Sequence, residues 1–527
     1  MPPAVGIDAI GVYVPRLYVD LTGEWAHVRA AALADGDVQK LVGKVTSGVG
    51  VRRMSVVDAH QDCATLAAMA AKRAIDAAGI DPRDLDYLAV GTETTVDQSK
   101  STAAYVLGML ERHYGVSLPE VGAPQFQFAC IGATYALEAA VSRIRAGDNT
   151  KPYSLIVASD VSKYPLGTAG EYTQGAGAVA LLVSENPRAV VLEPGLMATV
   201  TRDERDFFRP NWSAAAVVDG KYSIDVYLDC IQAAFAAYAD RLERLPGARE
   251  LGGRKLAGHD EPLFDVIDHF LFHVPFPRMA EYAAARLFTL QWLNDPRSRE
   301  RLAAEVPLAA AGTKQTPGED IRGWRKELER MVARSPMFRD AFEKKAARSL
   351  SLARDVGNIY SGSLYLALAS LFEQARDEAL AGHRIVFSSY GSGASAKVFS
   401  GIVADRYREV AQHLRLQEEL RSEEEGGARV ALTVAEYERL HGLSDCELDC
   451  ETSVLQKLRD GVVLAPADVA ALRAAWCKPS WRVRARGASV RPPRAEFALE
   501  RIGVSASAQL TDLGYRYYAW VPETVAG

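Results

Sequence analysis

The chain has 527 residues, of which 48% are hydrophobic and 24% are charged, and this composition excludes disordered, collagen-like and coiled-coil proteins. Its length corresponds to roughly three domains of average size, or to fewer if one fold is large. The net charge is −6, from 61 Lys and Arg against 67 Asp and Glu, which argues against a protein that coats nucleic acid or an anionic membrane.

Hydropathy and cysteine use predict a cytoplasmic protein. No apolar stretch approaches the roughly 20 residues of a membrane span, and the first residues lack the basic start and apolar run of an export signal. Six cysteines are too few for a disulfide framework in a chain of this length. Cys446 and Cys450 lie close together, but no second Cys or His pair follows at zinc-like spacing, so we expect no metal site.

The apolar runs predict an α/β protein with two similar halves. Residues 1–190 alternate short apolar runs with Ala-rich helical stretches such as 62–78, which indicates a layered arrangement around an internal sheet. Residues 191–410 repeat the pattern, with strands expected in DVIDHFLFHVPF and RIVFSSYGSG. Long charged helices are expected between 278 and 355.

Residues 411–527 are predicted to form a C-terminal extension. The charged stretch 411–427 is interpreted as a solvated boundary. Two helices are expected beyond it, followed by strands in FALERI and GYRYYAWV that return to the second half. A basic cluster before these strands is interpreted as an exposed edge or loop rather than a phosphate site; it consists of Arg482, Arg484, Arg486, Arg491 and Arg494.

The first candidate for chemistry along the chain is Glu93, in the segment GTETTVDQSK. This segment follows LDYLAV, a run typical of a buried strand, so Glu93 is expected at the carboxyl end of that strand. Ligands of open α/β sheets bind beyond such strand ends, and a buried carboxylate there can act as a general base. The alternative is a solvated or helix-capping glutamate, which is the commoner role.

Cys130, in QFQFACIGATYAL, is predicted to open a helix. Ala133, Leu137, Val141 and Ile144 recur at helical spacing, which indicates one buried helix face. The positive end of the helix dipole is expected to lower the pKa of a thiol at this position. Cys130 is therefore a candidate nucleophile, and a small buried hydrophobe is the equally weighted alternative.

Two histidines flank the apolar run of DVIDHFLFHVPF. His273 stands at the expected strand end before Pro275 and is the better candidate for a catalytic imidazole. His269 is interpreted as a core or edge histidine. Metal binding by the pair is the less favoured alternative, because no third ligand follows at a local spacing.

Two glycine motifs partly match a dinucleotide fingerprint. QGAGAVALLV leads into a strand-like run, whereas that fingerprint opens a helix, so this motif fails on context. SSYGSGASAKVF follows a strand and leaves a nicotinamide site open as an alternative. A tight turn beside an active site explains its glycines equally well.

Taken together and in order, these segments resemble the 3-hydroxy-3-methylglutaryl-CoA synthase family of thiolase-fold condensing enzymes. The resemblance spans about residues 5–400, and the set is far more specific than any single motif. The matching segments are GTETTVDQSK, ACIGATYAL, ASDVSKYPLGTAGEYTQGAGAVALLV, DFFRP, DGKYSIDVYL, FHVPFPRM, VGNIYSGSLYL and SSYGSG, and the closing FALERI and GYRYYAWV resemble the family's C-terminal strands.

The resemblance implies a Claisen-type condensation of acetyl-CoA with acetoacetyl-CoA, as in the mevalonate route to isoprenoids. It assigns the acetyl-enzyme to Cys130, removal of the acetyl methyl proton to Glu93, and a hydrogen bond to the developing oxyanion to His273. It implies no cofactor beyond the CoA thioester substrates. Further residues match the family's substrate-binding positions, namely Asn358, Tyr164, Thr173, Ser223, Ser392 and Arg278.

The same resemblance implies a thiolase-like fold of two similar α/β halves stacked as five layers. It places Cys130 on the N-terminal half, and His273 and Asn358 on the C-terminal half, with the site between them. It also implies a homodimer.

Some positions depart from the family pattern. FQFACIGAT lacks the charged residue and the tyrosine that many members carry beside the cysteine. Arg278 replaces the usual lysine that meets a CoA phosphate, and its planar guanidinium can still bind phosphate. Glu281 stands where further basic residues are frequent, and the 411–480 region is longer than in compact members.

These departures keep an alternative open, in which the acyl groups come from an acyl carrier protein and the enzyme installs β-branches in polyketides. An acidic carrier protein needs a basic docking patch, which the arginines between 482 and 494 could offer. A third alternative, a degenerate scaffold without activity, is disfavoured because Cys130, Glu93 and His273 are all present.

Overall fold

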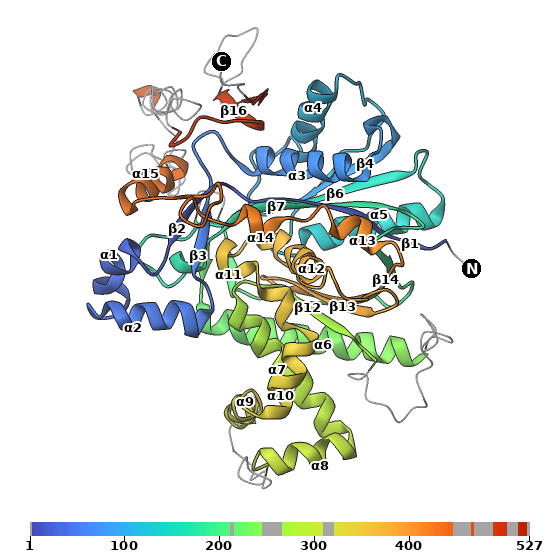
Figure 1. Cartoon of the computed structure of the whole chain (residues 1–527), viewed down its shortest axis with the longest axis vertical. Helices are drawn as coiled ribbons and strands as arrows, with labels where there is room; N and C mark the ends of the chain where they lie inside the picture. The colour runs from blue at the N-terminus through green and yellow to red at the C-terminus, as the bar shows by residue number, and fades with distance from the viewer. Residues whose placement is uncertain are drawn as a thin grey trace.

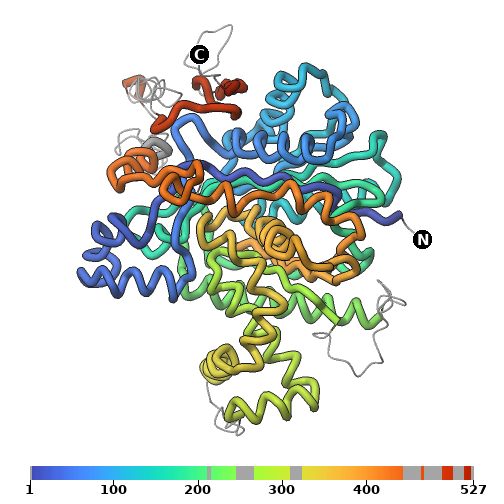
Figure 2. Tube along the Cα trace, viewed as in Figure 1, coloured from blue at the N-terminus to red at the C-terminus, as the bar shows by residue number. Residues whose placement is uncertain are grey.

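The computed structural model describes residues 3–210, 215–244, 266–308, 321–445, 465–467, 489–502 and 515–523 (Figures 1 and 2). Within these ranges no helix is both long and apolar enough to cross a membrane. Cys446, Cys450 and the arginines at 482, 484 and 486 lie outside the described residues, so the structure does not test the predictions made for them.

Ten of the described strands form one mixed sheet, in the order β12-β13-β14-β8-β1-β7-β6-β4-β5, with β9 paired to β14. The strands are β1 (Val5–Tyr13), β4 (Leu85–Gly91), β5 (Gln125–Phe126), β6 (Tyr153–Val161), β7 (Ala176–Glu185), β8 (Val190–Leu192), β9 (Ala198–Thr201), β12 (His269–Phe272), β13 (Arg384–Gly391) and β14 (Ser395–Val403). Most strand residues are buried, because both faces of the sheet are covered by helices.

Strands from the first 190 residues occupy one end of the sheet, and strands from later residues occupy the other. The short strand β8 joins them, because Val190 pairs with Ile7 of β1 and with Val403 of β14. The two sheets expected from the sequence are therefore hydrogen-bonded into one.

Helices lie in three layers, and the two ends of the sheet lie between them as two further layers, which gives five layers in all (Figure 1). One outer layer contains α3 (Cys63–Ala78) and α4 (Thr102–Tyr114), the middle layer α5 (Gly132–Ala146) and α12 (Ser363–Gln374), and the other outer layer α6 (Gly220–Arg244) and α7 (Pro277–Asn294). α3 contacts β1, β6 and β7, α12 contacts β1 and β12, and α6 contacts β13 and β14. The predicted layered α/β arrangement is confirmed.

The first strand shows how one segment supplies two cores. Ile10 and Val12 pack into the apolar core that contains α5 and α12, whereas Ala9 and Tyr13 pack into the core beneath α3. Successive side chains of a strand point to opposite faces, so β1 is buried on both sides.

The long charged segment after β12 folds into α7 and a helical projection at one end of the molecule (Figure 1). The projection contains α8 (Pro296–Glu305), α9 (Ile321–Val332) and α10 (Pro336–Lys345). Arg286 of α7 is buried and binds Glu329 of α9 and Asp229 of α6, both at 2.7 Å. This paired charge ties the projection to the outer helix layer.

A second small sheet carries the start of the C-terminal extension. β15 (Val430–Ala431) pairs with β2 (Leu17–Asp20), which pairs with β3 (Arg53–Val56). Nearby lie α1 (Glu24–Leu33), α2 (Val38–Gly43), the π-helical turn η1 (Lys44–Val49), α11 (Ala353–Val356) and α15 (Val434–Asp445). Figure 2 shows the blue start of the chain running beside the orange segment of α13 (Tyr407–Ala411), which contacts β1, and α14 (Leu416–Glu419).

The last strands differ from their predicted place. β16 (Glu496–Ile502) and β17 (Arg516–Val521) pair only with each other among the described strands. They pack against α3 and α4 of the first half, where Phe497, Leu499 and Tyr518 enter the core beneath those helices. The prediction that they return to the second half is wrong, because their apolar side chains cover the outer helix layer instead.

Candidate active site

Cys130 and Glu93 meet where β4 ends and α5 begins. The thiol of Cys130 donates a hydrogen bond to Glu93 Oε1 at 3.1 Å, and both side chains are buried. The close approach depends on Gly91, since a Cβ there would lie 2.2 Å from the backbone N of Ala133. Ala129, just before the cysteine, has a φ of 39°, which non-glycine residues rarely adopt. Glu93 thus follows the end of β4 and Cys130 precedes the start of α5, as the sequence predicts.

Burial controls the protonation of this pair. It raises the pKa of Glu93 to about 7, with nearby Asp160 acting in the same direction and Arg209 lowering it. Burial and the neighbouring Glu93 carboxylate raise the pKa of the Cys130 thiol well above its ordinary value. The expected lowering of this pKa by the helix dipole is wrong, because burial and an adjacent carboxylate outweigh it.

Arg209 is the cation of the site, and the sequence reasoning did not single it out. It follows β10 (Phe207–Phe208), which pairs with β11 (Val217–Val218). Its guanidinium lies 3.4 Å from Glu93 Oε2 and also donates to the carbonyl oxygen of Glu93. The only signal in the sequence was its place in DFFRP, one of the segments that resembled the family.

Asp160 is a second residue that was missed. It is fully buried on β6 and accepts hydrogen bonds from the backbone N of Glu93 at 2.9 Å and from Thr92 Oγ1 at 2.8 Å. It also accepts from the backbone N of Ser361 at 3.0 Å, in the turn η6 (Tyr360–Gly362) before α12. One carboxylate thus fastens the Glu93 loop to the second half of the chain.

His273 directly follows β12 and is fixed through its backbone. Its N–H donates to the carbonyl oxygen of Ser388 on β13 at 2.8 Å, and its own carbonyl accepts from the hydroxyl of Tyr227 at 2.9 Å. Burial lowers the pKa of its imidazole to about 3, so the ring is neutral near pH 7. His269 instead contacts His383, with ring nitrogens 3.0 Å apart, as a core histidine.

Asp206 links His273 to the cysteine side of the site. The ring centroids of His273 and Tyr390 lie 6.4 Å apart, and the Tyr390 hydroxyl donates to Asp206 Oδ2 at 3.0 Å. Ser223 Oγ donates to the same oxygen at 3.0 Å. The next residue, Phe207, packs in one apolar cluster with Cys130. Ser392 lies in the turn between β13 and β14, two residues after Tyr390.

Three other predicted substrate-binding residues lie around this cluster. Tyr164 packs with Cys130 and Tyr360. The carbonyl oxygen of Thr173 accepts the backbone N–H of Asn358 at 3.0 Å, while the Thr173 hydroxyl donates to the Gly170 carbonyl at 2.7 Å. The Thr173 hydroxyl is therefore engaged within its own turn, η3 (Glu171–Thr173).

Arg278 lies at the start of α7, away from the Cys130 cluster. Its guanidinium donates to the carbonyl oxygen of Ser47 at 2.7 Å and forms an ion pair with Glu281. Of the basic cluster near the C-terminus, Arg491 forms an ion pair with Glu423. Both arginines are thus already paired with a carboxylate.

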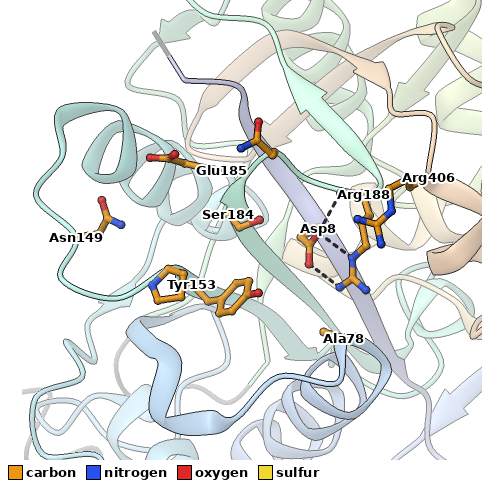
Figure 3. Close-up of a pocket in the computed structure, with 10 residues that line it drawn as sticks. Asp8, Ala78, Asn149, Tyr153, Ser184, Glu185, Arg188 and Arg406 are labelled. Atoms are coloured by element: carbon orange, nitrogen blue, oxygen red, sulfur yellow. Dashed lines mark hydrogen bonds and ion pairs between the residues drawn. The ribbon is translucent and has the colours of Figure 1, made fainter.

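A pocket on another part of the molecule carries none of the predicted site residues (Figure 3). It encloses about 540 Å³ beside β1 and β7, and Arg188 in its wall is bound by Asp8 at 2.6 and 2.9 Å. Across the described residues, no group of three or more His, Cys, Asp and Glu side chains is arranged to hold a metal ion.

Two family models match most of the chain. Hydroxymethylglutaryl-coenzyme A synthase N terminal matches residues 1–188, and hydroxymethylglutaryl-coenzyme A synthase C terminal matches residues 190–457. The hydroxymethylglutaryl-CoA synthase of Haloferax volcanii is 30% identical over 454 residues, covering 85% of this chain and 93% of the relative. That of Enterococcus faecalis is 33% identical over 441 residues, covering 83% and 91%.

Solved structures agree with these matches. MvaS in complex with 3-hydroxy-3-methylglutaryl coenzyme A superposes with a TM-score of 0.71 at 30% identity, over 99% of this chain and 100% of that chain. The HMG synthase of the curacin biosynthetic pathway superposes with a TM-score of 0.65 at 21% identity, over 98% and 100% of the two chains. The latter is a likeness of fold.

Proposed function

The chain belongs to the hydroxymethylglutaryl-CoA synthase family of thiolase-fold acyl-condensing enzymes, and on that premise we propose how its site works. It condenses acetyl-CoA with acetoacetyl-CoA and water, giving 3-hydroxy-3-methylglutaryl-CoA and CoA through an acetyl-cysteine. The observation that carries this proposal is the 3.1 Å hydrogen bond from the Cys130 thiol to Glu93.

In the first step Cys130 attacks the acetyl thioester. The Cys130 thiol is neutral in the free protein, so its proton passes to Glu93 as the new S–C bond forms. The bond between the acetyl carbon and the CoA sulfur then breaks, and CoA leaves as a thiol after taking up a proton. A carboxyl with a pKa of about 7 can accept and release this proton near neutrality.

In the second step Glu93 removes a proton from the acetyl methyl, and the resulting carbanion adds to C3 of acetoacetyl-CoA. Negative charge develops on the C3 oxygen, where the neutral His273 imidazole donates a hydrogen bond. This oxygen then takes up the proton that Glu93 removed from the methyl group, which gives the 3-hydroxyl and returns Glu93 to its ionised form. Water then hydrolyses the enzyme thioester and releases Cys130. This division of roles is supported by the buried, neutral state of the histidine.

The remaining predicted residues are proposed to bind the substrates. Tyr164, Asn358 and Ser223 line the acyl cavity, an assignment supported by the contacts of Tyr164 with Cys130 and of Ser223 with Asp206. Thr173 acts through its backbone contact with Asn358, and Ser392 lies on the oxyanion side. Arg278 binds a CoA phosphate after exchanging its Glu281 partner.

Several further properties are proposed on the family relationship. The reaction uses no cofactor besides the CoA thioesters, the enzyme is a cytoplasmic homodimer, and its product feeds isoprenoid synthesis by the mevalonate route. Light scattering of the purified chain tests the dimer. An acetylated acyl carrier protein is the alternative acyl donor, because HMG synthase of the curacin pathway, with the same fold, is also known in complex with an acetyl donor-ACP.

Intact-mass measurement tests the reaction class and the donor together. The protein is incubated with acetyl-CoA, or with an acetylated carrier protein, and then with acetoacetyl-CoA. We expect an acetyl adduct from acetyl-CoA that is absent in Cys130→Ala and retained in Cys230→Ala, a buried cysteine of α6. Release of the six-carbon product should follow. An adduct from the carrier protein alone would show that the carrier protein, and not acetyl-CoA, is the acyl donor. The absence of an adduct from both donors would overturn the proposal.

A further inference from the structure

The segment 162–175 brings Tyr164 to Cys130 and meets the second half at Asn358. It has little regular structure beyond the turn η3, so its shape depends on what holds it. Two glycines show how tightly it approaches its neighbours. A Cβ at Gly357 would lie 1.9 Å from the carbonyl oxygen of Gln174, and a Cβ at Gly175 would lie 2.7 Å from the carbonyl carbon of Gly357.

Both backbone polar groups of Tyr164 are held, directly or through Gln174, by α15, a helix of the C-terminal extension. The Tyr164 carbonyl oxygen lies 3.0 Å from His441 Nε2, and because a carbonyl only accepts, His441 carries its proton on that nitrogen. The Tyr164 N–H donates to Gln174 Oε1 at 2.6 Å. Gln174 Nε2 in turn donates to the hydroxyl of Tyr437 at 2.7 Å, which fixes the orientation of the amide.

Further contacts lock α15 in place against this segment. Lys163 Nζ donates to the carbonyl oxygen of His441 at 2.6 Å, and the rings of Tyr437 and His441 meet edge to face at 5.7 Å. Arg29 of α1 binds Glu438 at 2.7 Å and the fully buried Glu171 at 2.9 Å. One guanidinium therefore joins α1, α15 and the Tyr164 segment.

We propose that Tyr437 and His441 are positioning residues for the acyl cavity, which set Tyr164 against Cys130 through its backbone. The proposal deepens the condensation proposed above and rests on it for its catalytic consequence. It gives the start of the C-terminal extension a role in the reaction, although neither residue belongs to the Cys130 cluster. A shift of Tyr164 by about 1 Å would change its contact with an acetyl group on Cys130, and misplacements of that size can slow enzymes markedly.

Hydrogen exchange tests the positioning without using activity. In full-length His441→Ala and Tyr437→Phe, amides of 162–175 should exchange faster than in the wild type, while those of β4 keep their protection. His441→Gln keeps an N–H donor and should restore much of the protection. His413→Ala, an exposed histidine outside α15, is the matched control and should leave 162–175 unchanged.

Acetylation kinetics test the consequence. His441→Ala and Tyr437→Phe should slow acetyl-Cys130 formation by roughly tenfold, with His441→Gln in between. In a Tyr164→Ala background the same changes should cause little further loss, because they act through Tyr164. Unchanged exchange in 162–175, or fully additive losses, would overturn the inference. A wild type that is not acetylated at all would instead contradict the proposed function, and the exchange result would still decide the positioning.

Discussion

The surroundings of Glu93 shift the pKa of its carboxyl in opposite directions. Burial and the nearby Asp160 disfavour its charge, whereas the guanidinium of Arg209, 3.4 Å away, favours it. The resulting pKa of about 7 lets one group take the thiol proton of Cys130 and later a proton from the acetyl methyl. Arg209 thus limits how far burial raises the pKa of Glu93.

Replacing Arg209 by Gln should move the pH dependence of the reaction. In the proposed mechanism the ionised form of Glu93 is the base, so the rate should rise with pH through a pKa of about 7 in the wild type. Without the cation this pKa increases, and the rising limb of kcat/KM against pH moves to higher pH. On the acid side of that limb, the rate at a fixed pH falls about tenfold if the pKa of Glu93 increases by about one.

Arg209→Lys is the control for this prediction, because it keeps the positive charge but loses the planar fork. Its pH profile should lie close to that of the wild type. A rising limb at the same pH in Arg209→Gln and in the wild type would contradict the role given to Arg209.

At this scale the motifs located the residues proposed to react but not their partners. Cys130, Glu93 and His273 stand beside predicted strand and helix ends, so local patterns found them. Arg209 and Asp160 act on Glu93 from 116 and 67 positions away, and the sequence holds no local sign of such contacts. The predicted lowering of the Cys130 pKa was wrong for the same reason. A helix dipole could be inferred from the sequence, whereas the carboxylate buried beside the thiol could not.

Among the elements, the junction of β4 and α5 matters most for the site. Gly91 ends the strand, and a Cβ there would lie 2.2 Å from the backbone N and 2.3 Å from the Cα of Ala133. Backbone atoms cannot turn aside as a flexible side chain can. The strand and the helix must therefore separate to admit any larger residue, and this moves Glu93 away from Cys130.

Gly91→Ala should accordingly lower both stability and activity. We expect a loss of at least about 1–3 kcal/mol in unfolding free energy, typical of overpacked cores, together with slower acetylation. Gly43→Ala is the matched control, because Gly43 has helical backbone angles and open space around its Cβ position. Thermal unfolding measures both variants, and equal midpoints for the two would contradict the account of this junction.

The same elements show what patterns in a sequence can predict. Long buried strands such as β1, β7 and β13 appear as largely apolar segments, and α3 appears as an Ala-rich stretch with Asp62 as its cap and Gly79 at its end. The short strands β5 and β8 exist only through pairing with distant segments. Among the described strands β8 alone joins the two sheets, so the continuity of the sheet could not be predicted.

For the whole molecule, three described elements of the C-terminal extension, α15, β16 and β17, lie against the first half. β16 and β17 cover α3 and α4, and α15 supports the Tyr164 segment. FALERI and GYRYYAWV were correctly predicted as strands, but alternation alone does not tell which apolar surface a strand will cover. Their position therefore required the structure.

Buried histidines should make the folded molecule sensitive to acid. Burial and the neighbouring His383 lower the pKa of His269 to about 4 from its ordinary 6.5. As the pH falls from about 6.5 to about 4, His269 binds a proton in the unfolded chain but not in the folded chain, so the free energy of unfolding decreases on acidification. This single group can cost up to about 3 kcal/mol.

Urea unfolding at pH 6.5 and pH 4.5 measures the effect of His269. We expect the loss of stability between these values to be smaller in His269→Gln than in the wild type. His413→Gln replaces an exposed histidine and should show the loss of the wild type. A loss of the same size in all three proteins would show that His269 is not held neutral by the fold.

The central claim is that Cys130 carries the acetyl group and Glu93 carries out the step that follows. Peptide mass mapping of Glu93→Gln after acetyl-CoA, with and without acetoacetyl-CoA, tests it most directly. Because Glu93 also takes the thiol proton of Cys130, we predict that the acetyl group forms on Cys130 more slowly than in the wild type. We predict that this acetyl group then persists when acetoacetyl-CoA is added, with product formation lower by about 10²–10⁴-fold, the usual contribution of a general base. An acetyl group on another residue, or turnover of the adduct at the wild-type rate, would contradict the account.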